Sequence, residues 1–310
     1  MSSQVEVSPA VRQALRDGAP VVALESTILT HGLPRPDNYE AARSFEAILS
    51  GAGVTPATIA IIDGVPKVGL TAAEVERVAA DESAVKVSAR DIGIAMARKA
   101  TGGTTVAATS VLAAKAGVRV FATGGLGGVH RGASETFDES ADLVVLSRTP
   151  ITVVSAGVKS ILDIPATLER LETLSVAVVG YRTSRFPAFW LSDSGCDLDW
   201  RADSPEEIAD IMVARAAFGE PSALLVANPL PPDLQLDPGV LDGALEDALA
   251  VAADQGVRGK AVSPFLLDRI QQVTGGVSVR VNLQIARGNI ELAAKISRSW
   301  AQRAADPVRP

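Results

Sequence analysis

The chain has 310 residues, of which 47% are hydrophobic and only 4% aromatic, so Ala, Val, Leu and Ile must build most of the core. Its formal net charge of -7 argues against a general nucleic-acid binder, because neutralising phosphates requires clustered Lys and Arg. The lone cysteine, Cys196, excludes an intramolecular disulfide, which fits a reducing compartment. We find neither a signal peptide nor an apolar run that could span a membrane, and expect a cytoplasmic protein without a membrane partner.

The β-branched apolar runs of the chain predict buried strands, at residues 20–24, 58–62, 85–88, 118–122, 151–154, 176–179 and 223–226. Helical periodicity predicts helices at residues 38–50, 72–81, 104–116, 165–173, 205–217, 239–254, 264–274 and 281–304. This alternation favours an α/β protein with a three-layer α/β/α fold around a central, mostly parallel sheet. Asp63 and Gly64 are typical of a tight hairpin turn within residues 58–70, so we expect the sheet to be mixed.

The chain shows no linker, repeat or low-complexity segment, so we predict a single domain over residues 1–310. The helices after residue 239 have no predicted strands between them, and we expect them to pack as one layer. Residues 1–7 and 306–310 are expected to fray, because chain ends without an apolar pattern have little to pack against.

Lys159 lies between an apolar run and a helix in the segment ITVVSAGVKSILDIP. Apolar surroundings disfavour an ammonium group, so we expect the pKa of the Lys159 amine to be lowered. A neutral lysine amine is a nucleophile that can form a Schiff base with a sugar aldehyde. The alternative is a lysine that covers apolar neighbours with its stem and keeps its charged head in water.

Polar residues follow several predicted strands, at the position where open α/β sheets bind their ligands. Glu25 comes directly after the first strand, and a carboxyl group in apolar surroundings has a raised pKa and can act as acid and base. The alternative for Glu25 is a helix-capping or salt-bridged side chain. His31 lies in the following loop and is either a ligand-binding residue or a turn residue.

Four glycines lie within residues 124–128, and His130 and Arg131 follow them. Glycine amides can turn toward an anion and let it approach closely, so this loop is a candidate phosphate site. The spacing matches neither a Walker A loop nor a dinucleotide fingerprint, and a mobile glycine turn is the alternative. Residues 101–105 open a predicted helix and form a second candidate anion site, unless their hydroxyls serve only as helix caps.

Acidic residues are concentrated in the segment TFDESAD, where Asp138 and Asp142 are four residues apart and would share one face of a helix. Together with Glu135 and Glu139, these carboxylates suit a hard divalent cation that keeps several waters. A solvated acidic helix start is the alternative. The His and Cys spacing of structural zinc is missing, and the acidic neighbours of Cys196 argue against a catalytic thiol.

Over nearly its whole length the chain resembles the pseudouridine-5'-phosphate glycosidase family, in segments that include ALESTILTHGLPRPDN, IAIIDGVPKVGLT, VKVSARDI, GGTTVAATSVLAAKAGVRVFATGGLGGVHRG, TFDESAD, AGVKSILDI and GYRTSRFPAF. Members of this family cleave the C–C glycosidic bond of pseudouridine 5'-phosphate reversibly, giving uracil and ribose 5-phosphate. The resemblance implies these small molecules as partners, an α/β/α core, a homotrimer and a divalent metal, usually Mn²⁺.

The matching motifs also imply roles for individual residues. Glu25 in ALEST would be the proton donor and Lys159 in AGVKS the nucleophile, and Asp138 in TFD would hold the metal. The residues that would bind substrate are Lys86, Val106 through its backbone, Ser140, Ala141 and Asp142, with His130 and Asn282 as less specific matches.

The chemistry of the implied reaction explains these residue types. A C–C glycosidic bond has no heteroatom leaving group, so two carboxylates alone are poorly suited to cleave it. A lysine imine at C1' can accept electrons while uracil leaves as a carbon acid. Two other interpretations stay open: a Schiff-base phosphosugar aldolase or C-nucleoside lyase that uses another base, and a phosphosugar-binding protein without catalysis.

Overall fold

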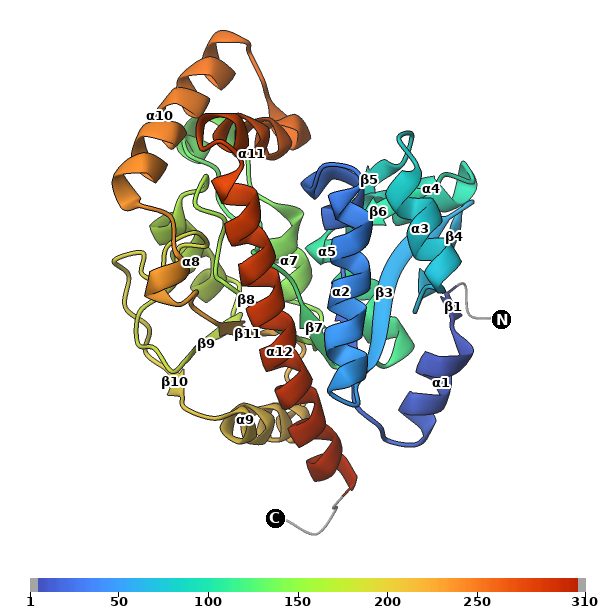
Figure 1. Ribbon diagram of the computed structural model, residues 1–310. Helices are drawn as coiled ribbons and strands as arrows, with labels where there is room; N and C mark the ends of the chain where they lie inside the picture. The colour runs from blue at the N-terminus through green and yellow to red at the C-terminus, as the bar shows by residue number, and fades with distance from the viewer. Residues whose placement is uncertain (1–4, 306–310) are drawn as a thin grey trace.

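The computed structural model describes residues 5–305, and helices cover both faces of a mixed, mostly parallel sheet (Figure 1). The centre of the sheet is parallel, in the order β3 (Thr55–Ile62), β2 (Val21–Leu24), β7 (Val120–Ala122), β8 (Thr152–Ser155), β11 (Leu224–Ala227) and β9 (Ala177–Tyr181). The two-residue strand β10 (Arg201–Ala202) extends it beyond β9. The predicted α/β/α fold is therefore confirmed.

The sheet is mixed because β3 also has antiparallel neighbours. A hairpin joins it to β4 (Val65–Val68), and Asp63 and Gly64 form the turn with φ of 51° and 81°. Both angles are in the left-handed region that a two-residue turn of this kind requires. On its carboxyl-terminal half β3 also pairs with β6 (Gly102–Thr104), which in turn pairs with β5 (Val85–Val87). The predicted hairpin is confirmed at the predicted residues.

The layers above and below the sheet explain why the strand sequences are apolar throughout. One layer contains α2 (Asp37–Gly51), α9 (Pro205–Phe218) and α12 (Val277–Ala305), and the other contains α1 (Pro9–Arg16), α5 (Val106–Ala116), α7 (Ala141–Leu146) and α8 (Ile164–Thr173). Successive strand residues point to opposite faces. Accordingly Val22 of β2 packs under the first layer and Val21 under the second, so both faces of this strand are buried.

The helices after residue 239 do not form one layer, which corrects that prediction. α12 packs on the sheet together with α2 and α9, because Ala286, Ile290 and Ala293 form a buried stripe at helical spacing. α10 (Pro238–Asp254) and α11 (Val262–Val273) instead pair with each other away from the centre of the sheet (Figure 1).

Several short elements are not predicted by the sequence pattern. They are β1 (Glu6–Val7), β6, β10, α4 (Ile92–Ala97), α6 (Ala133–Thr136), α7, and single helical turns at Ile28–Gly32, Ala89–Asp91, Pro232–Leu234 and Gly259–Ala261. α3 (Ala72–Ala80) ends one residue before its predicted end. β1 pairs with β4, so the prediction that residues 6 and 7 fray is wrong, and residues 1–4 and 306–310 lie outside the described chain. Within residues 5–305, no helix has an apolar stretch that could cross a membrane.

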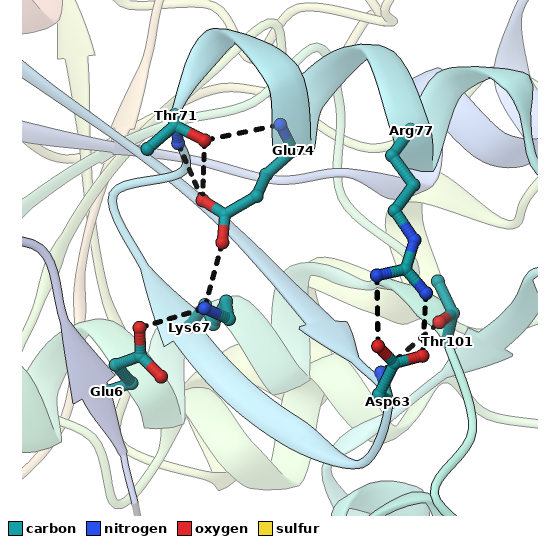
Figure 2. Close-up of polar contacts among 7 residues, drawn as sticks. All are labelled: Glu6, Asp63, Lys67, Thr71, Glu74, Arg77 and Thr101. Carbon is teal, nitrogen blue, oxygen red and sulfur yellow. Dashed lines mark hydrogen bonds and ion pairs between the residues drawn. The ribbon is translucent and has the colours of Figure 1, made fainter.

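Polar side chains connect the outer strands to α3 (Figure 2). Lys67 of β4 lies 2.8 Å from Glu6 of β1 and 2.8 Å from Glu74 of α3. Glu74 also forms a capping box with Thr71, so one carboxylate joins the start of the helix to the strand. Partly exposed ion pairs contribute at most about 1 kcal/mol each, and we therefore regard this cluster as fixing the position of β1 more than the stability of the fold.

We expect Gly64→Ala to destabilise the hairpin strongly. A Cβ at position 64 would lie 2.6 Å from the carbonyl oxygen of Met96, and the φ of 81° disfavours any side chain. Urea denaturation should show a loss of about 2–4 kcal/mol in the free energy of unfolding.

The matched control is Gly53→Ala, where φ is 71° but nothing lies within 4 Å of the added Cβ. It should cost only about 1 kcal/mol, from backbone strain alone. Equal losses in the two variants would show that the contact with Met96 does not matter.

Candidate active site

The predicted site residues meet at the carboxyl ends of the central strands. The helices that follow β2 and β7 lie on opposite faces of the sheet, and ligands bind α/β proteins in the crevice between two such strands. A cavity of about 440 Å³ lies here, and it is lined by nine of the ten predicted residues: Glu25, Lys86, Val106, His130, Asp138, Ser140, Ala141, Asp142 and Lys159. The tenth, Asn282, lines an adjoining cavity of about 80 Å³ that shares Glu25, Lys86 and Lys159 with the first.

Glu25 extends from the end of β2 into the junction of the two cavities. The hydroxyl of Thr123, directly after β7, donates a hydrogen bond to Glu25 Oε1. Burial raises the pKa of the Glu25 carboxyl, and the nearby Lys159 charge and the Thr123 hydrogen bond lower it to a smaller extent. A carboxyl group with a raised pKa can hold a proton near neutral pH and deliver it to a substrate, which is the property expected of a general acid.

Lys159 reaches the cavity because the chain turns sharply after β8. Gly157 has a φ of 79°, and a Cβ on it would lie 2.3 Å from the carbonyl oxygen of Pro187. Val158 is fully buried beside Leu126, and the Lys159 amide donates to the Leu126 carbonyl over 3.2 Å. Only glycine fits this turn. Val158 after it is buried, and the partly exposed side chain of Lys159 lines the cavity.

The glycine-rich loop after β7 is closely packed, and three of its amides donate to protein acceptors, so the predicted anion site stays a prediction for the rest of the loop. The amide of Leu126 donates to Gly157 O, that of Gly127 to Asp142 Oδ2 and that of Val129 to Thr167 Oγ1, each over 2.9 Å. These amides are therefore not available to an anion. The glycines are needed for space: a Cβ on Gly127 would lie 2.2 Å from Ser140 Oγ.

The second predicted anion site, residues 101–105, is divided between two places. Residues 102–104 form β6 instead of opening a helix, and the hydroxyl of Thr101 accepts a hydrogen bond from the Asp63 amide in the hairpin. Thr105 is the N-cap of α5, as the alternative predicted, and its side chain accepts from the amide of Ala108. Thr105 and Val106 also line the large cavity, so only the end of this segment can contact a ligand.

Asp138 and Asp142 do not share a helix face, which corrects that expectation. Asp138 precedes α7, whereas Asp142 is in its first turn and is buried. The Asp142 carboxylate accepts the amides of Ala107 and Gly127, each over 2.9 Å, and so joins the start of α5 to the glycine loop. Each of its two oxygens thus accepts one backbone amide and keeps a second lone pair for a ligand.

Four basic side chains line the large cavity, and one of them lies beside Asp138. They are Lys86, Arg90, Lys159 and His130. Burial lowers the pKa of His130, Asp138 at 4.0 Å raises it, and Lys86 and Lys159 lower it further. Burial and Lys86 also lower the pKa of His31, which lines the smaller cavity. Two neutral imidazoles beside cationic side chains can donate to or accept from a phosphate or sugar hydroxyl.

The acidic segment offers few ligands to a metal. Among residues 5–305, no group of three or more His, Cys, Asp or Glu side chains is arranged to hold an ion. Of the carboxylates of this segment that line the large cavity, Asp142 accepts two amides and Glu139 pairs with Arg170 over 2.9 Å, which leaves Asp138 to bind a cation. One carboxylate in a water-accessible cavity fits a hard cation that keeps most of its water, and it does not fit a cage of protein ligands.

Two residues of the site, Thr123 and Ser263, are missed by sequence reasoning. Thr123 follows a strand directly, as Glu25 does, but nothing in the sequence shows that its hydroxyl meets a carboxyl group from another strand. Ser263 of α11 lines both cavities, although helix periodicity gives no reason to select it. Cys196 lines neither cavity, in agreement with the absence of a predicted thiol role.

Several known proteins are similar to the chain over nearly its whole length. A family model described as indigoidine synthase A like protein matches residues 10–299. The pseudouridine-5'-phosphate glycosidases of Frankia alni and Saccharopolyspora erythraea are 56% and 58% identical to the chain, over 99% and 95% of its length and 85% and 97% of theirs. The crystal structure of prealnumycin C-glycosynthase AlnA in complex with ribulose 5-phosphate is similar with a TM-score of 0.91 and 37% identity, covering 98% of this chain and 99% of that one.

Identity of this extent over nearly the full chain establishes the relationship. The chain belongs to the pseudouridine-5'-phosphate glycosidase family, whose family model carries the description indigoidine synthase A like protein.

Proposed function

We propose that the protein reversibly cleaves the C–C glycosidic bond of pseudouridine 5'-phosphate, giving uracil and ribose 5-phosphate. The observation that carries the proposal is that Lys159 and Glu25 line the same cavity and interact electrostatically. The names of the relatives support the reaction, and the ribulose 5-phosphate bound to the similar C-glycosynthase supports a phosphosugar as ligand.

Lys159 is the nucleophile of this proposal. In cleavage, its neutral amine forms a bond to C1' as the bond from C1' to the ring oxygen O4' breaks. The nitrogen lone pair then forms an imine with C1', and the electrons of the C1'–C5 bond leave with C5 of uracil. Water hydrolyses the imine to release ribose 5-phosphate and restore the amine. Synthesis follows the same steps in reverse.

Glu25 balances the protons of these steps. The amine gives up two protons when it becomes an imine, while O4' and C5 of uracil gain one each. One carboxyl group that alternates between its acid and base forms can therefore carry both protons. Glu25 suits this shuttle because burial raises its pKa while Lys159 and Thr123 stabilise its charged form.

Other residues of the large cavity bind the sugar phosphate. Lys86 supplies positive charge, His130 supplies hydrogen bonds, and the amide of Val106 lies in the first turn of α5, where backbone N–H groups favour anions. Ser140, Ala141 and Asp142 hold the sugar from the start of α7. Binding energy from the non-reacting phosphate keeps C1' at the amine and contributes to the rate in this way.

Asp138 would hold a hydrated Mn²⁺ ion in the large cavity. When bound, such an ion supplies positive charge and ordered water next to the substrate.

We also propose, from the family resemblance, that the protein acts as a homotrimer, and from its single cysteine that it acts in the cytoplasm. A single domain over residues 1–310 stays a prediction.

Borohydride should trap Lys159 when ribose 5-phosphate is added without uracil, because imine formation with the open-chain aldehyde needs no base. Mass spectrometry should locate the reduced pentose phosphate on the peptide that contains Lys159. Lys159→Arg should abolish this adduct. Lys115→Arg, at an exposed lysine on α5, is the control and should leave it unchanged. An adduct found only on other lysines would refute the assigned nucleophile.

Glu25→Gln should lower kcat for uracil release by about 10²–10⁴, because the amide cannot transfer protons. Glu46→Gln is a matched control. Burial also raises the pKa of Glu46, and its carboxylate also accepts from a threonine hydroxyl, that of Thr58 at 2.5 Å, but it lines neither cavity. Its kcat should equal that of the unaltered protein, and a similar loss in both variants would remove the case for Glu25.

Thr123→Val should shift the alkaline limb of the pH profile of kcat for cleavage to higher pH. The Thr123 hydroxyl stabilises the charged form of Glu25 and thus lowers its pKa, so removing it raises the pKa further. Cleavage begins with protonated Glu25, which therefore persists to higher pH. Thr123→Ser keeps a hydroxyl and should keep the limb in place; equal profiles for the two variants would contradict this link.

A further inference from the structure

A buried indole contacts the polar residue of the smaller cavity. Trp190, between β9 and β10, is 1% exposed, and its Nε1–H donates to Oδ1 of Asn282 over 2.5 Å. Asn282, on the first turns of α12, is half-buried and lines the cavity together with Glu25 and Lys159. The side chains of Ile28, Leu33, Phe189 and Leu267 make the rest of this cavity largely apolar, as is typical of a pocket for a planar base.

Trp190 is held firmly in this position. Its ring packs against that of Phe189 with centroids 5.2 Å apart. Its carbonyl oxygen accepts from the amide of Leu236 over 3.1 Å, and its own amide donates to Ser160 Oγ over 3.4 Å. Ser160 directly follows Lys159, so the turn that carries the reactive lysine also binds the backbone of Trp190.

This contact decides which end of the Asn282 amide meets a ligand. An indole nitrogen can only donate a hydrogen bond. Its partner in Asn282 must therefore be the oxygen of the amide and not the nitrogen. The NH₂ group of Asn282 then remains for the cavity. The pocket wall therefore presents N–H donors at this position, and reversing the amide would place two donors against each other at the indole.

We propose that Trp190 is a positioning residue for base recognition, which fixes the Asn282 amide so that its NH₂ group selects a pyrimidine with a 4-oxo group over one with a 4-amino group. In uracil the 4-oxo group is bonded to the ring carbon next to C5, the reacting atom, and it accepts N–H donors. In cytosine the amino group at this position would meet a donor with a donor. This inference rests on the proposed function and specifies its choice of base.

The test is the synthesis reaction, measured as kcat/KM for the base at saturating ribose 5-phosphate. Trp190→Phe should lower kcat/KM for uracil by about tenfold or more, mainly through KM, because the amide is no longer oriented. Asn282→Ala should lose at least as much. The double variant should equal Asn282→Ala, since the indole acts only through the amide. Full activity of Trp190→Phe with uracil, or losses that add completely, would overturn the inference.

Two further variants separate positioning from packing. Trp200→Phe makes the same chemical change at an indole that is 71% exposed, and it should leave kcat/KM unchanged. Asn282→Asp keeps an acceptor for the indole and replaces the donor with an oxygen, so the preference should move from uracil toward cytosine. An unchanged preference in Asn282→Asp would also overturn the inference, even if Trp190→Phe does not fold.

Borohydride trapping with ribose 5-phosphate alone distinguishes this inference from the proposed function. The sugar half-reaction does not involve Asn282, so Trp190→Phe should form the Lys159 adduct as the unaltered protein does. If the unaltered protein forms no adduct, the proposed function fails. If adducts form normally and the choice of base does not depend on Trp190, only the inference fails.

Discussion

The carboxyl group of Glu25 is buried at the end of β2, and the rest of the site depends on which groups offset the loss of hydration of its charged form. Burial alone would keep the group protonated, whereas the Thr123 hydroxyl and the Lys159 charge favour its ionised form, so the two protonation states are brought closer in free energy. The compensating groups follow β7 and β8. They reach Glu25 because Leu24 pairs in register with Ala122, and Ala122 with Val154, so three parallel strands end at the same level. Strand register thus brings together the groups on which the proposed proton shuttle depends.

Close backbone packing around these strand ends keeps the site rigid. Gly127 and Gly128 of the loop after β7 and Gly157 in the turn after β8 admit no Cβ, and the amides of Leu126 and Gly127 donate to protein acceptors. Asp142 serves the same purpose, since its carboxylate joins the first turn of α5 to the loop. A conspicuous glycine or aspartate near a phosphosugar site can therefore act by supporting the backbone that carries the chemistry, and contact with the ligand is not required to explain it.

In the proposed function, the two adjoining cavities divide the substrate between them. The larger has cationic side chains and a helix start on its wall, which suit a sugar phosphate, and the smaller is mainly apolar with Asn282 as a directed donor, which suits a base. Lys159 and Glu25 belong to both, so the bond between sugar and base would lie at their junction. Placing the reactive amine at this boundary lets each half of the substrate be bound without the other, which a reversible reaction with two products requires.

The sequence by itself determines the order of strands and helices, the hairpin at Asp63 and Gly64, and the candidates Glu25 and Lys159, because burial periodicity, turn residue types and strand ends are local properties of the chain. It does not show the short strands β1 and β6, since two or three residues carry no period and form only where a partner strand is present. It also does not show that the amides of Leu126, Gly127 and Val129 donate to acceptors within the protein. The contacts of Thr123 with Glu25 and of Trp190 with Asn282 join residues from distant parts of the chain. Only the tertiary structure decides such contacts, because they depend on which strand ends and helix starts are brought together by packing, and no local pattern records that.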